Sequence, residues 1–151
     1  MPEAARDYLH LNLYNVHQRV AKNFRRGRVF LCGDAAHVNN PIGGMGLNGG
    51  LQDAANLADK LRAILLGGES ERLLDLYNLQ RRTVATEFVQ EQSIANKNRL
   101  EARDPEVRQR NRDALKHVAA DPKSARQFLL RSSLITAQRR AASMTLDQLG
   151  S

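Results

Sequence analysis

Hydrophobic and polar positions alternate near the start of the chain. Leucine occupies every second position from Leu9 to Leu13, within residues 8–14. This period of two predicts a half-buried strand. A continuous apolar run follows at residues 28–32 and stops at Gly33. A short run of this kind is typical of a strand buried on both faces.

Helical spacing begins after the glycine-rich stretch 33–50. Residues 51–66 are rich in helix formers and place Leu51, Ala54, Ala58, Leu61 and Leu65 on one face. The pair Gly67-Gly68 predicts the end of this helix. Ser70 followed by Glu71 predicts a second helix, whose apolar spacing continues to about Arg103.

Two copies of one helix-start signal follow. Asp104-Pro105 and Asp121-Pro122 each place a capping Asp before a Pro at the first helical position. They predict helices over 105–119 and 122–133, and a shorter one is expected over 136–144. The chain is therefore expected to be mostly α, with a short β element followed by four or five helices. Because a sheet of two strands is not independently stable, we expect a missing upstream part.

Composition narrows the function classes. The 151 residues contain 23 Lys and Arg against 16 Asp and Glu, a net charge of +7. The basic residues are scattered, without an aromatic-interleaved tract or zinc-ligand spacing, so we expect solvated helix faces, no nucleic-acid partner and no metal. A single cysteine, Cys32, excludes an internal disulfide. No apolar stretch could cross a bilayer, so we expect a cytoplasmic protein without a membrane partner.

The glycine-rich stretch has the order strand, acidic loop, glycine-rich loop, helix. Asp34 follows the predicted strand end, where ligands of open α/β sheets bind, and its carboxylate could accept hydrogen bonds from sugar-type hydroxyls. Gly44 and Gly46 permit a close backbone approach, so free N–H groups near Leu47 and Asn48 would face an electron-rich oxygen. A glycine-rich turn that only reverses the chain is the simpler alternative. That alternative does not explain why Gly33-Asp34-Ala35-Ala36-His37, Pro41, Asn48 and Asp53 occur in this order on one strand–loop–helix unit.

This segment resembles the second flavin motif of group A FAD-dependent aromatic monooxygenases, such as para-hydroxybenzoate, phenol and 3-(3-hydroxyphenyl)propionate hydroxylases. The matching residues are Gly33-Asp34-Ala35-Ala36-His37, Pro41, Gly44-Met45-Gly46-Leu47-Asn48, Asp53-Ala54 and Asn56-Leu57. The resemblance extends over residues 15–82, just under half of the chain.

The resemblance implies FAD as the cofactor. It implies that Asp34 holds the ribityl hydroxyls, that Pro41 lies beside the isoalloxazine ring, and that the amides of Leu47 and Asn48 bind the pyrimidine oxygen. Donors there would favour the reduced flavin. The complete enzyme would use NAD(P)H and O₂ to hydroxylate a small aromatic substrate, with the cofactor performing the chemistry and no catalytic side chain in this chain.

The family also implies an α/β, Rossmann-like FAD/NAD(P)-binding fold, of which residues 1–100 would be the C-terminal part and 101–151 a helical tail. The family's N-terminal Gly-x-Gly-x-x-Gly segment and its mid-chain Asp-Gly motif are absent, and Asp59 stands where Trp is frequent. We therefore expect dependence on an N-terminal segment, or a homo-oligomer. The alternatives are another FAD oxidoreductase with the same strand–loop–helix segment, a truncated non-catalytic fragment, or a basic helical binding module.

Other polar residues of the segment receive structural interpretations. His37 is expected to make a structural hydrogen bond. Asp53 and Asn56, in the first turns of the helix, are expected to tie the loop to the helix. Arg19 could orient the flavin region or face solvent, and the sequence does not decide between these.

Overall fold

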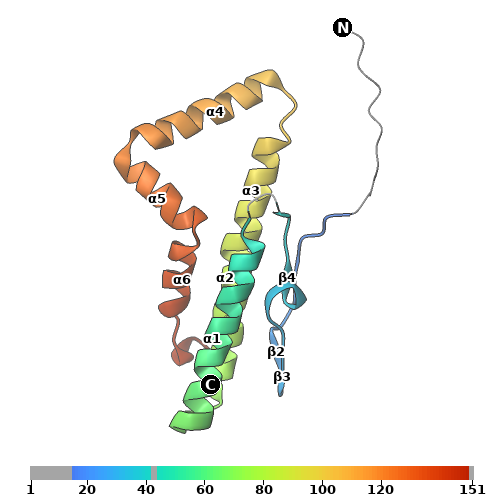
Figure 1. The fold of residues 1–151 in the computed structure, drawn as a ribbon, viewed down its shortest axis with the longest axis vertical. Helices are drawn as coiled ribbons and strands as arrows, with labels where there is room; N and C mark the ends of the chain where they lie inside the picture. The colour runs from blue at the N-terminus through green and yellow to red at the C-terminus, as the bar shows by residue number, and fades with distance from the viewer. Residues whose placement is uncertain (1–14, 42–43, 150–151) are drawn as a thin grey trace, which may run out of the picture.

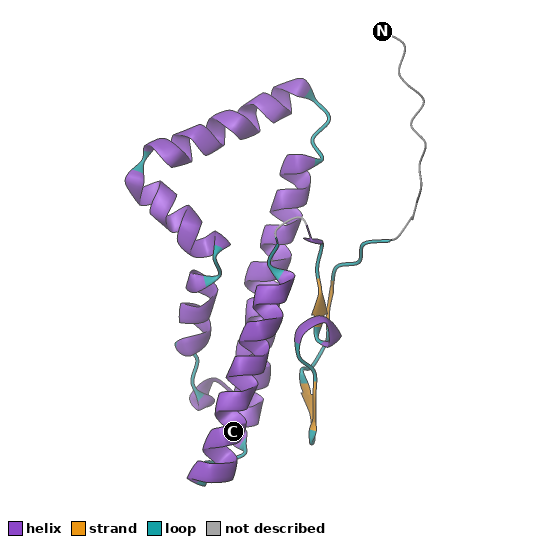
Figure 2. Ribbon diagram, in the orientation of Figure 1, coloured by secondary structure: helices purple, strands orange, loops and turns teal. Residues whose placement is uncertain are grey.

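A computed structural model describes residues 15–41 and 44–149, and the strand predicted over 8–14 lies outside them. Within the described residues, short strands come first and helices follow (Figures 1 and 2). The strands pair antiparallel as β1 with β4 and as β2 with β3. Their bounds are β1 Arg19–Val20, β2 Arg25–Arg26, β3 Val29–Phe30 and β4 His37–Val38. The prediction of a mostly helical chain with a short β element is confirmed.

The prediction that residues 28–32 form a strand buried on both faces is wrong. Only β3 is a strand there, and Val29 is 67% exposed. β3 pairs with β2 across a turn at Gly27, whose φ of +59° favours glycine. Within the described part of the chain this hairpin has no second layer over the Val29 side, so that face meets solvent.

α1, Gly46–Gly67, begins inside the glycine-rich stretch, so Leu47 and Asn48 lie in its first turn, where the helix start was expected. It ends where predicted, because Gly68 adopts the left-handed conformation with φ 69° and its N–H donates to the carbonyl of Ile64. The predicted apolar face of this helix is largely exposed, with Leu51 60% and Leu65 75% accessible. The side that packs inward carries the buried Gly49 and Asp53.

A continuous helical rod follows α1 and lies beside it (Figure 1). It consists of α2 Arg72–Val84, a π-helical turn Ala85–Gln90, and α3 Glu91–Leu100. The predicted long helix from Ser70 to about Arg103 is therefore confirmed in extent, but the π turn was not predicted.

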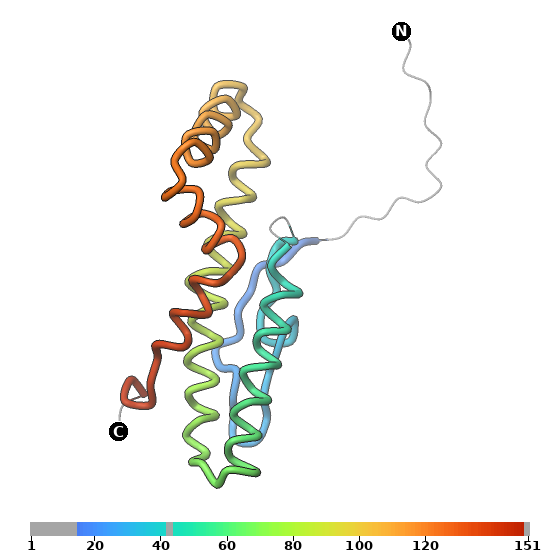
Figure 3. The backbone as a smooth tube through the Cα atoms, turned by 60° about the vertical axis from the view of Figure 1, so that its left-hand side comes forward, coloured from blue at the N-terminus to red at the C-terminus, as the bar shows by residue number. Residues whose placement is uncertain are grey.

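The C-terminal tail leaves the rod and returns to it. α4, Pro105–Ala120, leads away from α3, α5, Pro122–Ser132, turns back, and α6, Ile135–Ala142, packs against α2 (Figures 1 and 3). A 3₁₀ turn, Leu146–Leu149, ends the described chain. Both predicted Asp caps are present.

Two apolar clusters form the core. One joins the strand region to α2 and the π turn through Phe24, Ala36, Tyr77 and Ala85. The other joins the glycine-rich loop, the rod and the tail through Met45, Val84, Phe88, Val89, Leu134, Ala137 and Ala141. The glycine-rich loop is therefore packed, through Met45, against the C-terminal tail.

Candidate functional site

Asp34 lies in a 3₁₀ turn, Gly33–Ala35, and its side chain is exposed. The turn starts at Gly33 with φ +60°, a conformation that costs other residues free energy. It packs directly against α1. A Cβ atom added to Gly50 would lie 3.1 Å from the Gly33 Cα, so two glycines allow this close approach. The turn of Asp34 is thus held against the start of α1.

The first turn of α1 has backbone donors without an intrahelical partner. Intrahelical bonding begins where the Gly49 N–H donates to the Met45 carbonyl at 2.9 Å, so the preceding amides of the helix have no intrahelical acceptor. No side chain caps this end, and no acidic residue lies in the first turn. Leu47 and Asn48 are exposed there. An electron-rich group could therefore approach these amides.

Two of the predicted flavin residues, Pro41 and Gly44, lie just before α1. Pro41 and Gly44 are exposed, and the Gly44 N–H donates to the Pro41 carbonyl at 2.9 Å. Gly44 has φ +62°, and an added Cβ would meet nothing within 4 Å. Of the predicted flavin residues Asp34, Pro41, Gly44, Gly46, Leu47 and Asn48, all are exposed except Gly46, which is half-buried.

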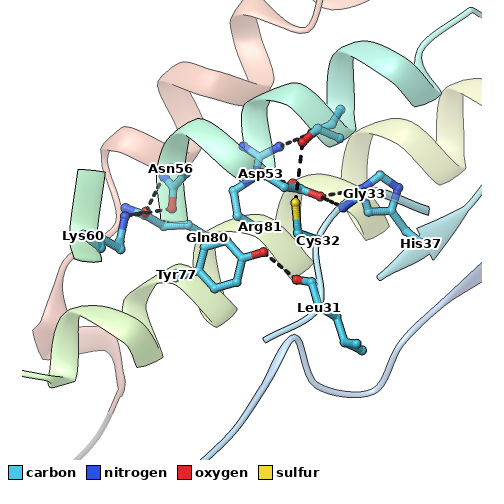
Figure 4. A network of polar contacts seen from close by, with 12 residues as sticks. Leu31, Cys32, Gly33, His37, Asp53, Asn56, Lys60, Tyr77, Gln80 and Arg81 are labelled. Atoms are coloured by element: carbon cyan, nitrogen blue, oxygen red, sulfur yellow. Dashed lines mark hydrogen bonds and ion pairs between the residues drawn. The ribbon is translucent and has the colours of Figure 1, made fainter. Parts of the chain in front are cut away.

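Beneath this surface, Asp53 is fully buried and links three elements (Figure 4). Its Oδ2 accepts a hydrogen bond from the Gly33 N–H at 3.0 Å and lies 2.8 Å from the His37 Nε2. Its Oδ1 accepts from the Arg81 Nε at 2.6 Å. The expectation that Asp53 ties the loop to the helix is confirmed, as is the structural hydrogen bond of His37.

Charge and burial act on Asp53 in opposite directions. Burial alone raises the pKa of the Asp53 carboxyl, but the His37 hydrogen bond and the Arg81 guanidinium outweigh burial and lower it. The carboxylate is therefore ionised at neutral pH. The His37 Nδ1 and the Arg81 Nη1 are buried and have no hydrogen-bond partner within the described residues.

A second polar network joins α1 and α2 to the tail. Lys60 Nζ donates at 2.8 Å to both the Asn56 Oδ1 and the Gln80 Oε1. The Gln80 Nε2 donates to the carbonyl of Ala141 at 2.9 Å. Burial lowers the pKa of Lys60. Asn56 therefore ties α1 to α2. The sequence predicted a loop contact for both Asp53 and Asn56, and the structure shows it for Asp53.

Arg19, which the sequence left undecided, and Cys32 have simple surroundings. Arg19 is exposed on β1. Cys32 is half-buried, and burial raises the pKa of its thiol, which disfavours the reactive thiolate.

Sequence reasoning missed the role of Arg81, which is 1% exposed. A signal was present, because Arg81 falls on the apolar helical stripe formed by Tyr77, Val84 and Phe88. A cation on a buried stripe indicates a buried anionic partner.

The described residues contain no cluster of His, Cys, Asp and Glu suited to a metal ion. Among the same residues, no helix combines the length and apolar character needed to cross a membrane.

Comparison with known proteins identifies a family and several relatives. The profile of the FAD binding domain family matches residues 2–92. Para-nitrophenol 4-monooxygenase from Pseudomonas sp. (strain WBC-3) is 48% identical over 121 residues, covering 80% of this chain and 30% of that protein.

Two solved structures of aromatic monooxygenases are also similar to this chain. The p-nitrophenol 4-monooxygenase PnpA from Pseudomonas putida DLL-E4 superposes with a TM-score of 0.75 and 45% identity, covering 82% of this chain and 32% of that one. A ternary complex of aklavinone-11 hydroxylase with FAD and aklavinone superposes with a TM-score of 0.54 and 41% identity, covering 56% of this chain and 16% of that one. The chain thus spans about a third or less of these relatives. With more than half of its residues matched by the family profile, the chain belongs to the FAD binding domain family.

Proposed function

We propose that this chain supplies the ribityl and pyrimidine side of the FAD site in a monooxygenase that hydroxylates an aromatic substrate with NAD(P)H and O₂. One observation carries the proposal: an exposed carboxylate and an uncapped helix start are held together by the contact between Gly33 and Gly50. These are the groups that sugar hydroxyls and an electron-rich ring oxygen require.

Each residue has a distinct part in this arrangement. Asp34 accepts hydrogen bonds from the ribityl hydroxyls, and the amides of Leu47 and Asn48 donate to the pyrimidine oxygen. Because that oxygen gains negative charge on reduction, donors at a helix start stabilise the reduced flavin. Pro41 borders the ring, while Gly44 and Gly46 leave room for its approach. When bound, FAD supplies the oxygen-transfer chemistry, so no side chain of this chain is assigned a catalytic role.

The division of the chain follows from the same assignment. Residues 1–100 form the C-terminal part of a Rossmann-like FAD-binding domain, and residues 101–151 form a helical tail. The ADP half of FAD and most of the substrate pocket require an N-terminal segment or a second subunit. Para-nitrophenol and aklavinone appear in the names of relatives, which supports an aromatic substrate class for the complete enzyme.

Equilibrium dialysis of the purified chain against FAD tests the proposal. We expect weak, saturable binding, which Asp34→Asn weakens about tenfold, since a hydrogen bond to a charged acceptor is lost. Asp59→Asn is the matched control, because Asp59 is exposed on α1 about three helical turns after Asn48. Absence of saturable binding would refute the proposed surface, and equal affinity in Asp34→Asn would refute the role of Asp34.

The isolated chain is expected not to hydroxylate aromatic compounds. A yellow preparation with stoichiometric FAD and NAD(P)H-dependent oxygen uptake would show that the chain is sufficient on its own.

A further inference from the structure

We propose that Asp53 and Arg81 are positioning residues that hold the Gly33–Ala35 turn so that Asp34 faces the ribityl chain. This inference rests on the proposed function of Asp34 and adds a mechanism for its orientation. Neither residue touches the exposed flavin surface, since both are buried with 0% and 1% accessibility.

The geometry makes Asp53 the connection between the two parts of that surface. Asp53 lies on α1, whose first turn carries the amides of Leu47 and Asn48. Its Oδ2 receives the N–H of Gly33, the residue immediately before Asp34. Figure 4 shows the contact between Asp53 and Gly33. One carboxylate therefore couples the turn that carries Asp34 to the helix that carries the Leu47 and Asn48 amides.

The Gly33 peptide needs such a restraint. With φ +60°, Gly33 has a conformation that glycine leaves freely, because it has no Cβ to restrict it. The Ala36 N–H donates to the Gly33 carbonyl at 2.8 Å, and this bond fixes the end of the turn rather than its beginning. The bond to Asp53 fixes the Gly33 N–H, and hence the direction in which the chain enters Asp34.

A carboxylate suits this position better than an amide. Asp53 offers two acceptor oxygens to the donors on Gly33 and Arg81, with His37 sharing Oδ2. An asparagine has one acceptor oxygen, and its NH₂ group can only donate. Asp53→Asn must therefore give up either the Gly33 contact or the Arg81 contact. Arg81 in turn holds the carboxylate in place through Nε at 2.6 Å.

A comparison of two flavins tests this role separately from folding. Riboflavin contains the ribityl chain, and lumiflavin carries a methyl group in its place, so their affinity ratio reports the contribution of Asp34. In the wild-type chain we expect riboflavin to bind about tenfold more tightly than lumiflavin. Asp34→Asn should remove that preference while lumiflavin affinity stays unchanged.

Two variants address the positioning pair. Asp53→Asn should lower the riboflavin preference at least threefold, with lumiflavin affinity less affected. Because a buried unpaired Arg81 could unfold that variant, Asp53→Leu/Arg81→Met is the second test: it removes both charges, so the fold is retained, but Gly33 has no acceptor. It should lose the preference as well. Asp59→Asn is the control and should keep it, and circular dichroism confirms folding of each variant.

The outcomes separate the two proposals. If the folded double variant keeps the wild-type preference while Asp34→Asn loses it, the positioning role is refuted and the flavin surface stands. Failure of the wild-type chain to prefer riboflavin, or to bind either flavin, refutes the role of Asp34 and the positioning role together. Loss of preference in the double variant at unchanged lumiflavin affinity supports the inference, whereas an equal loss for both flavins contradicts it.

Discussion

Replacing Arg81 by Met would leave the Asp53 carboxylate buried without its cationic partner. The two side chains are 1% and 0% exposed, and their Nε and Oδ1 atoms are 2.6 Å apart. Removing one member of such a pair costs about 3–5 kcal/mol, since the remaining charge loses its compensation. With a urea m-value of about 2 kcal/mol/M, the unfolding midpoint of Arg81→Met should fall by about 1.5–2.5 M.

Urea unfolding followed by far-ultraviolet circular dichroism measures this shift, because the chain is mostly helical and lacks Trp. The matched control is Arg131→Met. Arg131 Nη2 also lies 2.6 Å from a carboxylate, that of Glu91, but these side chains are 49% and 63% exposed. An exposed pair contributes about 0–1 kcal/mol, so the control midpoint should fall by no more than about 0.5 M.

The double variant Asp53→Leu/Arg81→Met completes the test. The double variant loses the hydrogen bonds of Gly33, His37 and the Gly49 carbonyl but leaves no buried charge unpaired, so it should be more stable than Arg81→Met alone. Equal midpoint losses in Arg81→Met and Arg131→Met would refute the coupling of these charges. A double variant that is less stable than Arg81→Met alone would refute it as well.

Three further predictions concern pH, the end of α1 and the loop anchor. Because the pKa of Asp53 is lower in the folded chain than in the unfolded one, its stabilisation is present above the ordinary Asp pKa of about 3.9 and is lost as the pH falls through the lowered value. Thermal melts between neutral and strongly acidic pH should show this loss, and a flatter profile in Asp53→Leu/Arg81→Met; an unchanged profile would contradict it. Gly68→Ala should destabilise by about 1–2 kcal/mol because of its φ of 69°, whereas Gly67→Ala should stabilise by about 0.4–1 kcal/mol, with urea midpoints deciding the sign. Met45→Ala should cost about 2–5 kcal/mol in the same assay, since Met45 is 3% exposed; a cost within about 0.5 kcal/mol would mean that the tail does not anchor the loop.

Local signals in the sequence predicted the helix ends well. Asp104 accepts a hydrogen bond from the Glu106 N–H at 2.8 Å, and Asp121 accepts one from the Ser124 N–H at the same distance. These bonds join residues two or three positions apart, so the sequence contains the whole interaction. The C-terminal end of α1 at Gly68 was predictable for the same reason.

Long-range features were not predictable in this way. The bond from Arg81 to Asp53 joins residues 28 positions apart, and the motif alone indicated only one of its members. The exposure of Val29 depends on which other elements cover the strand, and a continuous run of apolar residues does not reveal that. The expected flavin residues were predicted from their resemblance to a motif, and the structure adds that Asp34, Pro41, Gly44, Leu47 and Asn48 are exposed.

The π-helical turn Ala85–Gln90 sets the register of everything that follows it. A π turn contains one residue more than the α-helix that would replace it. If the same residues formed regular α-helix instead, α3 would be rotated by about 100° relative to α2. Ser93 would then leave its fully buried position, and Glu91 would no longer meet Arg131 of the tail. The turn therefore accommodates one additional residue without changing the orientation of α3, and deleting one residue within it should be better tolerated than deleting one within α2, which has buried residues along its length.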